Sequence, residues 1–402
     1  MPKKKKTRRE ILEKYEKNYV RQKHGTLSKN TKGREIIEKE DEYRLPFERD
    51  CHRILHSEPF RRLRHKTQVF YKPKNDHICT RLDHSLYLAS IATTIARNIG
   101  ANIDLVYAIS LGHDLGHAPF GHTGEKILTQ LVSDDKKGPG DFVFKHELHS
   151  LRVVDYLAKL PPREGPGLNL SFEVRDGIVS HYGEGYPTKI EPNFSKRSSE
   201  LPETIVGESL PATIEGCIVR LTDKIAYLGR DIEDADTANL IDIGDNSITE
   251  LKELKSFFGE ISNREIITRL TRNIIDNASL DSPNIGFDAA HSEALKKLYD
   301  FSVKFIYDHE KLNNYKIFAE FILQNLYKFC KSHIEDAGHE NLSRPYTEKN
   351  GYYLLEILHE FYSYTYRVPI VPWRANVDFI AGMTDNFAIS AFQEISIPQD
   401  II

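Results

Sequence analysis

The stretch HDLGHAPFGHTGE, residues 113–125, concentrates three histidines, an aspartate and a glutamate in thirteen positions. Three glycines and a proline interrupt it, so a regular helix is disfavoured there. Imidazole is the commonest metal ligand in proteins, and it also moves protons near neutral pH. The pattern predicts a loop whose side chains bind a metal ion and transfer protons. The rest of the fold must then hold this loop in place.

The segments before this loop have helical patterns. His84, Leu88, Ile91, Ile95 and Ile99 recur at three- or four-residue spacing, and Gly100 follows as a helix terminator. The segment NIDLVYAISLGHDLG, residues 102–116, is apolar on nearly every side after Asn102, a good N-cap residue, which predicts a buried helix. Strand-like alternation is scarce throughout, so we expect an all-α fold. A new helix is expected to begin at Thr123.

A third helix is predicted in the segment TIEGCIVRLTDKIAYLGRDIEDAD, residues 213–236, with an apolar stripe of isoleucine and leucine. Asp223, Tyr227, Asp231 and Asp234 lie on the opposite face. This polar face either contacts solvent or supplies a further metal ligand.

An aspartate at the end of a buried helix, such as Asp114, is costly in free energy unless it is paired or binds a cation.

The organisation of the chain is predicted in three parts. Residues 1–45 form a basic N-terminal arm with a lead-in helix, residues 46–245 the helical core, and residues 246–402 a helical extension without a separating linker. Loops are expected at 133–141 and 161–169. The polar segment between Gly183 and Pro211 has no clear periodicity, which favours a lid or an insertion.

Composition excludes several classes of protein. The chain has 402 residues, 40% of them apolar and 28% charged, as in ordinary globular proteins. Its four cysteines are far apart, so neither a disulfide framework nor a thiolate zinc site is indicated, and a cytoplasmic location fits. No apolar run approaches the length of a membrane helix. The basic residues at the N-terminus indicate a solvated tail, since the net charge is only −4.

The order of three motifs carries a resemblance to a known family. TRLDHS (80–85), HDLGHAPFGHTGE (113–125) and LTDKIAY (221–227) resemble the H…HD…D signature of the HD-domain phosphohydrolases. More narrowly, the chain is similar to the deoxyguanosine triphosphate triphosphohydrolase-like family. FRRLRHKTQVF (60–70), FKHELHS (144–150) and VDFIAGMTDNFA (377–388) support this. Ala118 departs from the proline of many relatives, which should alter the stiffness of the loop more than its chemistry.

The resemblance implies a metal centre and an acid–base pair. His84, His113, Asp114 and Asp223 would hold one divalent ion, and the mixed nitrogen and oxygen donors leave manganese, magnesium, iron and zinc open. His122, oriented by Glu125, would move the proton, and His117 would lie beside the substrate phosphates.

The resemblance also implies the substrate contacts. Gln68, Tyr227 and Asp231 would surround a deoxyribose, with Val69 close to the sugar face. His117 and His146 would approach the phosphates. The cations Arg62, Arg81 and Lys224 would offset the phosphate charge.

The activity implied is hydrolysis of a deoxynucleoside triphosphate to a deoxynucleoside and inorganic tripolyphosphate. Two alternatives stay open: an HD phosphodiesterase acting on cyclic nucleotides or nucleic acid ends, and a non-catalytic nucleotide-binding regulator. Members of the family commonly form homo-oligomers, often hexamers. Some are activated at a second site, so a nucleotide or single-stranded DNA effector is a further expectation. No membrane partner is expected.

Overall fold

The computed structural model of the chain describes residues 7–70, 77–161, 167–183, 185–186, 188–197, 201, 209–347 and 351–397. Within these residues there is no strand, and extended segments make only two isolated bridges, Thr67 with Thr80 and Ile190 with Ile285. The predicted all-α fold is confirmed.

In chain order the helices are α1 (Arg8–Tyr19), α2 (Pro46–Leu55), α3 (Glu58–Arg62), α4 (Arg81–Ile99), α5 (Ile103–Gly112), α6 (Gly121–Ser133), α7 (His146–Arg152), α8 (Phe172–Val179), α9 (Ile214–Thr237), α10 (Thr249–Phe258), α11 (Asn263–Asn277), α12 (Ala289–Ser302), α13 (Asn313–Leu342), α14 (Tyr353–Thr365), α15 (Pro372–Ala381) and α16 (Asp385–Ser396).

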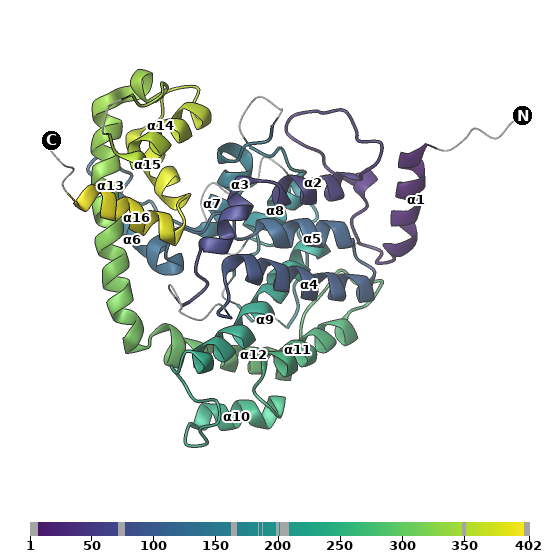
Figure 1. Ribbon diagram of the computed structural model, residues 1–402. Helices are drawn as coiled ribbons and strands as arrows, with labels where there is room; N and C mark the ends of the chain where they lie inside the picture. Colours follow the sequence, from purple (N-terminus) through teal and green to yellow (C-terminus); the bar gives the residue numbers. More distant parts are fainter. Residues whose placement is uncertain are drawn as a thin grey trace, which may run out of the picture.

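The first hydrophobic core lies around α4, α5 and α9, which pack on one another (Figure 1). Helices α2 and α8 cover α5, and α11 covers α9. Leu88, Ile109 and Ile218 are fully buried in this core, which continues into α10, α11 and α12. Helices on both sides of residue 245 therefore share one core. The boundary at that residue stays a prediction.

Local signals set the ends of α4 and α5, and the roles of Gly100 and Asn102 are as predicted. Thr80 and Asp83 form a capping box at the start of α4, and Gly100 ends it in the left-handed conformation with a φ of 75°. The side chain of Asn102 accepts hydrogen bonds from the backbone of Asp104 and Leu105, which caps α5. Because His113 and Asp114 directly follow α5, the end of this helix places both side chains in the core.

The polar face of α9 is not a solvent-exposed face. Asp231 and Asp234 are only 2% and 4% exposed, while Asp223 and Tyr227 are partly buried. The interpretation of this face as solvent-exposed is therefore wrong. The helix is covered on both sides because α4 and α11 pack against it along with α5 and α8.

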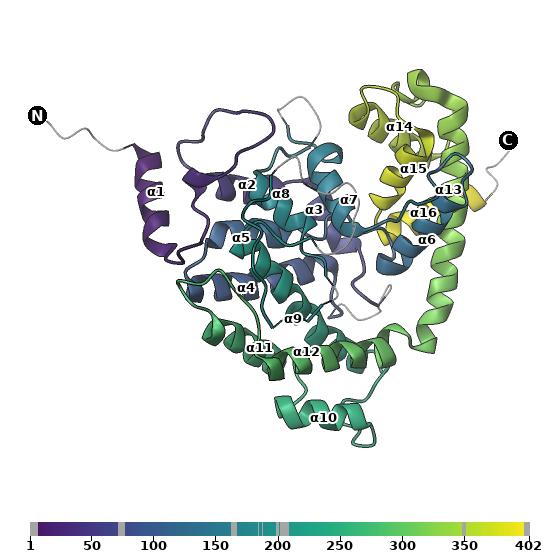
Figure 2. The same cartoon turned by 180° about the vertical axis from the view of Figure 1, so that it is seen from behind.

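The second hydrophobic core joins α6 to the C-terminal helices. The long helix α13 runs along one edge of the molecule beside α14, α15 and α16 (Figure 1). Seen from behind, α6 lies against α13 (Figure 2). Ala118 and Phe120, from the loop before α6, are buried in this core. The 113–125 stretch thus begins in the first core and ends in the second.

The predicted loops are only partly covered by the structure. Residues 134–141 form turns between α6 and α7, as expected. Much of the 161–169 loop and of the 183–211 segment, namely 162–166, 184, 187, 198–200 and 202–208, lies outside the described residues. The same holds for residues 1–6, and the predicted basic tail is already helical from Arg8.

We expect Gly116 to be essential for the fit of the loop on α7. Its N–H donates to Ser150 Oγ at 2.8 Å, and a Cβ at this position would lie 2.1 Å from Ser150 N and 2.5 Å from His146 O. Gly116→Ala should lower the free energy of unfolding by about 1–3 kcal/mol through overpacking, as measured by urea denaturation. Gly140→Ala is the control, because nothing lies within 4 Å of its Cβ position. Equal stability of the two variants would contradict this account.

Candidate active site

Three helices bring four predicted metal ligands together. His84 comes from α4, His113 and Asp114 follow α5, and Asp223 comes from α9. His84 Nε2 lies 3.2 Å from His113 Nε2 and 2.9 Å from Asp223 Oδ1. His113 Nε2 lies 3.3 Å from Asp114 Oδ1 and 3.7 Å from Asp223 Oδ1. The three helices thus bring these four side chains close together, and their roles as ligands stay predictions.

These separations suit ligands of a common ion. With metal–ligand bonds of about 2.1 Å, two ligand atoms lie about 3 Å apart at a right angle and about 4 Å apart when opposite. His113 Nδ1 lies 2.8 Å from Ser110 O, so its N–H donates there and Nε2 keeps its lone pair. Burial lowers the pKa of His113 to about 4, which keeps the imidazole neutral at pH 7. The donor set therefore fits a divalent metal.

Asp114 joins the metal ligands to the rest of the site. Its Oδ2 accepts a hydrogen bond from Arg81 Nη1 at 2.9 Å, and its Oδ1 lies 3.0 Å from His117 Nε2. Burial alone would raise the pKa of Asp114, but His113, His117 and Arg81 hold it well below its usual value. The carboxylate is consequently charged although it is buried.

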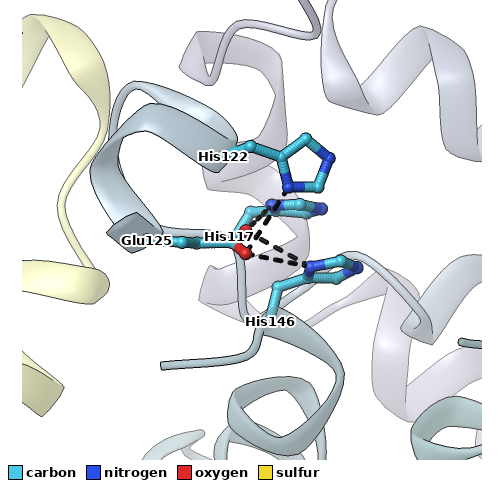
Figure 3. Close-up of side chains that lie close together, drawn as sticks. All are labelled: His117, His122, Glu125 and His146. Atoms are coloured by element: carbon cyan, nitrogen blue, oxygen red, sulfur yellow. Dashed lines mark hydrogen bonds and ion pairs between the residues drawn. The ribbon is translucent and has the colours of Figure 1, made fainter. Parts of the chain in front are cut away.

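A second cluster surrounds Glu125 (Figure 3). Glu125 Oε1 lies 2.6 Å from His117 Nδ1 and 3.2 Å from His146 Nδ1, and Oε2 lies 3.5 Å from His122 Nδ1. The rings of His117 and His146 stack at 3.7 Å between centroids. The predicted pair of His122 and Glu125 is close in space, but the nearest imidazole to Glu125 is that of His117.

The three imidazoles differ in environment. Burial, Arg81 and His146 lower the pKa of His117 to about 3. Burial opposes the charged form of His146, but Glu147 and Glu125 raise its pKa to about 9. His122 is 68% exposed, so it alone of the three is open to solvent.

The turn before α6 sets these positions. Phe120 adopts a φ of 66°, unusual for a residue with a side chain, and Gly121 follows at 58°. Because of this turn, α6 begins at Gly121 and not at Thr123 as predicted. His122 consequently lies in the first turn of the helix.

The C-terminal helices hold this turn through Asp385. Its Oδ1 accepts from Phe120 N at 2.9 Å, and its Oδ2 accepts from Thr67 N at 3.0 Å and from the Thr67 hydroxyl. The ammonium of Lys66 donates to the backbone oxygens of His117 and Ala381. The loop is therefore attached to the 377–388 segment by buried hydrogen bonds.

The comparisons with known proteins agree with the geometry. The sequence profile described as HD domain matches residues 81–228. A deoxyguanosinetriphosphate triphosphohydrolase-like protein of Caldanaerobacter subterraneus subsp. tengcongensis is 34% identical over 97% of this chain and 96% of its own length. Proteins of the same description from Clostridium tetani (33%, covering 94% and 93%) and Desulfatibacillum aliphaticivorans (35%, covering 93% and 94%) are similar.

The chain belongs to the deoxyguanosinetriphosphate triphosphohydrolase-like family. The resemblance read from the motifs is thereby confirmed, and with it the class of HD-domain phosphohydrolase. Among the described residues of the chain, no helix is long and apolar enough to cross a membrane.

The structure places the residues expected to contact a phosphate group as follows. Arg81 is buried against Asp114, and its guanidinium would lie 3.1 Å from a Cβ at Gly121. Lys224 Nζ donates to Gly185 O at 2.6 Å and lies 4.3 Å from the centre of the Tyr186 ring. Arg62, at the end of α3, is partly buried. Lys224 would have to leave Gly185 to reach a phosphate.

The residues expected around the sugar lie near the metal ligands. Tyr227 faces His84, with 6.4 Å between ring centres. Burial raises the pKa of Asp231 to about 7, and its Oδ2 accepts from Tyr307 OH at 2.7 Å. Gln68 Oε1 is buried without a hydrogen-bond partner in the described parts of the chain, and Val69 packs against the first core.

The sequence motifs did not identify His181, Tyr307 or Asp385 as residues of the site. The ring of His181 lies 5.1 Å from that of His113, although nothing in the local sequence links them. Asp385 was inside a quoted motif, and its position before an apolar helix could have identified it as a helix-start residue. Only the packing of the two cores shows what it contacts.

We expect Asp385→Ala to destabilise the protein, because it leaves the buried N–H of Phe120 and the partly buried N–H of Thr67 without an acceptor. The free energy of unfolding should fall by about 1–3 kcal/mol in a denaturant titration. Asp385→Asn keeps one acceptor oxygen and should lose less. If Asp385→Ala were as stable as the wild-type protein, the contact would not hold the turn.

Proposed function

We propose that this protein hydrolyses deoxynucleoside triphosphates at the α-phosphorus, giving a deoxynucleoside and inorganic tripolyphosphate. One observation carries the proposal: the His117 ring lies between Asp114, at 3.0 Å, and Glu125, at 2.6 Å, and so joins the metal ligands to the acid–base cluster. The description of the relatives as deoxyguanosinetriphosphate triphosphohydrolase-like supports the substrate class.

His84, His113, Asp114 and Asp223 would hold the ion, which we propose to be divalent manganese, magnesium, iron or zinc. When bound, such an ion supplies Lewis acidity, which polarises a phosphoryl oxygen and makes water more acidic. Asp114 and Asp223 would offset its charge, and the Ser110 carbonyl holds the His113 ring in the tautomer that could bind it.

His122 is the proposed proton donor. Hydrolysis forms a bond between water oxygen and phosphorus, breaks the bond to O5′, and places a proton on O5′. In an in-line displacement the leaving oxygen lies opposite the incoming water, so its proton donor should lie outside the metal ligands. His122 meets this condition: its Nδ1 faces Glu125, and its other nitrogen points away from that carboxylate (Figure 3). Its exposure lets it recover a proton from solvent.

The remaining residues bind the substrate in this proposal. His117, His146, Arg62, Arg81 and Lys224 would offset the phosphate charge, since cations and N–H donors bind phosphate oxygens strongly. Gln68, Tyr227 and Asp231 would bind the deoxyribose beside Val69. The buried oxygen of Gln68 would accept a sugar hydroxyl.

Assembly and regulation are further proposals from the family resemblance. We propose a cytoplasmic homo-oligomer, with a nucleotide or single-stranded DNA as an effector. We also propose that residues 46–245 form the catalytic region and residues 246–402 support it. Light scattering with and without deoxynucleotides tests the assembly.

The function is tested by incubating the protein with each deoxynucleoside triphosphate and its ribonucleotide counterpart, with manganese and other divalent metals. We expect tripolyphosphate and a deoxynucleoside. Cleavage of cyclic nucleotides or of nucleic acid ends in place of this reaction would favour the phosphodiesterase alternative. Binding without turnover of any deoxynucleotide would favour a regulator.

His122→Ala and Asp114→Ala separate proton transfer from metal binding. His122→Ala should lower kcat by about 10²–10⁴-fold while bound metal is unchanged, because general acid catalysis contributes that much. Asp114→Ala should lose both metal and turnover. Metal analysis and steady-state kinetics on the same samples measure both. A fully active His122→Ala variant would contradict the assignment of the proton donor.

A further inference from the structure

Two histidines outside the candidate active site face each other between C-terminal helices. His333 lies on α13 and His359 on α14, and these two helices pack on each other (Figure 1). His333 Nε2 lies 2.8 Å from His359 Nε2. His359 is only 5% exposed, whereas His333 is half-buried. The packing of the helices therefore brings two imidazole nitrogens to a single point.

The ring of His359 is oriented in the way that is usual for a metal ligand. Its Nδ1 lies 2.9 Å from Arg344 O, in the segment that joins the two helices, so the Nδ1–H donates there. Histidines that bind metals usually donate their other ring N–H to a backbone carbonyl or a carboxylate. The lone pair of His359 Nε2 consequently points at His333.

A carboxylate and a cavity adjoin the pair. Asp336 lies three residues after His333 on α13, and side chains at this spacing are neighbours on one helix face. Both line a cavity of about 340 Å³, together with Phe329, Tyr346 and Tyr352. Because Asp336 is exposed, its carboxylate can turn toward His333 without breaking a buried contact. The cavity is open to solvent, so it admits an ion and the waters bound to it.

We propose that His333, His359 and Asp336 bind a zinc ion, with water in the remaining position. Two imidazoles, one carboxylate and a water make a tetrahedral set of nitrogen and oxygen donors, which zinc takes in proteins. The ion joins α13 to α14 and so strengthens the attachment between them. This site lies in a different part of the fold from the candidate active site and does not depend on the proposed function.

A small movement converts the present contact into a metal site. Two ligand atoms of a tetrahedral zinc ion lie about 3.4 Å apart, whereas the two Nε2 atoms are 2.8 Å apart. The half-buried His333 ring borders the cavity and can shift by this difference. Without an ion, the Nε2–H of His333 donates to His359 Nε2. With an ion, that proton moves to Nδ1 of the same ring, and both Nε2 atoms then offer lone pairs.

Counting zinc ions on the full-length protein tests the site. Equilibrium dialysis against Zn²⁺, followed by metal analysis, should give one ion fewer per chain for His333→Gln and for His359→Gln than for the wild type. His339→Gln is the matched control and should bind as many ions as the wild type. His339 lies on the same helix, and its Nδ1 contacts Tyr362 OH of α14, at 3.2 Å, in place of an imidazole. Equal counts in the wild type and the first two variants would overturn the proposal.

Anomalous scattering from crystals of the wild-type protein grown with Zn²⁺ gives a second readout, which does not require the variants to fold. We expect a zinc peak about 2.0–2.2 Å from Nε2 of both His333 and His359 and from a carboxylate oxygen of Asp336. Zinc at the candidate active site with no peak between these histidines would refute the proposal and leave the pair as a hydrogen bond. Zinc between them, without turnover of any deoxynucleotide, would support this site and count against the proposed function alone.

Discussion

The buried carboxylate of Asp114 is the group on which the rest of the site depends. It contacts the adjacent His113, His117 three residues later in the same loop, and Arg81 from α4. Moving a carboxylate out of water costs several kcal/mol even after relaxation of the protein. The surrounding imidazoles and the Arg81 guanidinium offset this cost, and a bound cation would offset more of it. The same contacts hold His113 and His117 in position in the candidate active site.

The 113–125 stretch begins in the first hydrophobic core and ends in the second. The first core fixes His113 and Asp114 at the end of α5, whereas the second core holds Phe120 and α6. The C-terminal helices therefore position Glu125 and His122, although they lie far away in sequence. Buried contacts of Asp385 with the turn, and of Asp378 in α15 with Arg152 in α7, maintain this attachment. The C-terminal region thus contributes to the geometry of the site.

Local signals in the sequence predicted much of the fold. Gly100 and Asn102 set helix ends through local geometry within a few residues, which a sequence displays directly. The set of His84, His113, Asp114 and Asp223 came from the resemblance that the order of the three motifs carries, not from helix periodicity alone. Their roles as ligands stay predictions.

What the sequence did not predict depends on contacts between distant segments. His181 does not lie at helical spacing from any other candidate residue. It comes close to Asp114 only because α8 packs against α5 and α7. The burial of Asp231 and Asp234 follows from helices that cover both faces of α9. The closer contact of Glu125 with His117 than with His122 follows from the turn at Phe120, whose left-handed conformation no local pattern indicates.

The most direct test of the central claim is a crystal structure of the protein grown with Mn²⁺, with the ion located by anomalous scattering. The account predicts a strong peak about 2.0–2.3 Å from Nε2 of His84 and His113 and from carboxylate oxygens of Asp114 and Asp223. Manganese bound elsewhere, with Asp223 turned away from the two imidazoles, would contradict it.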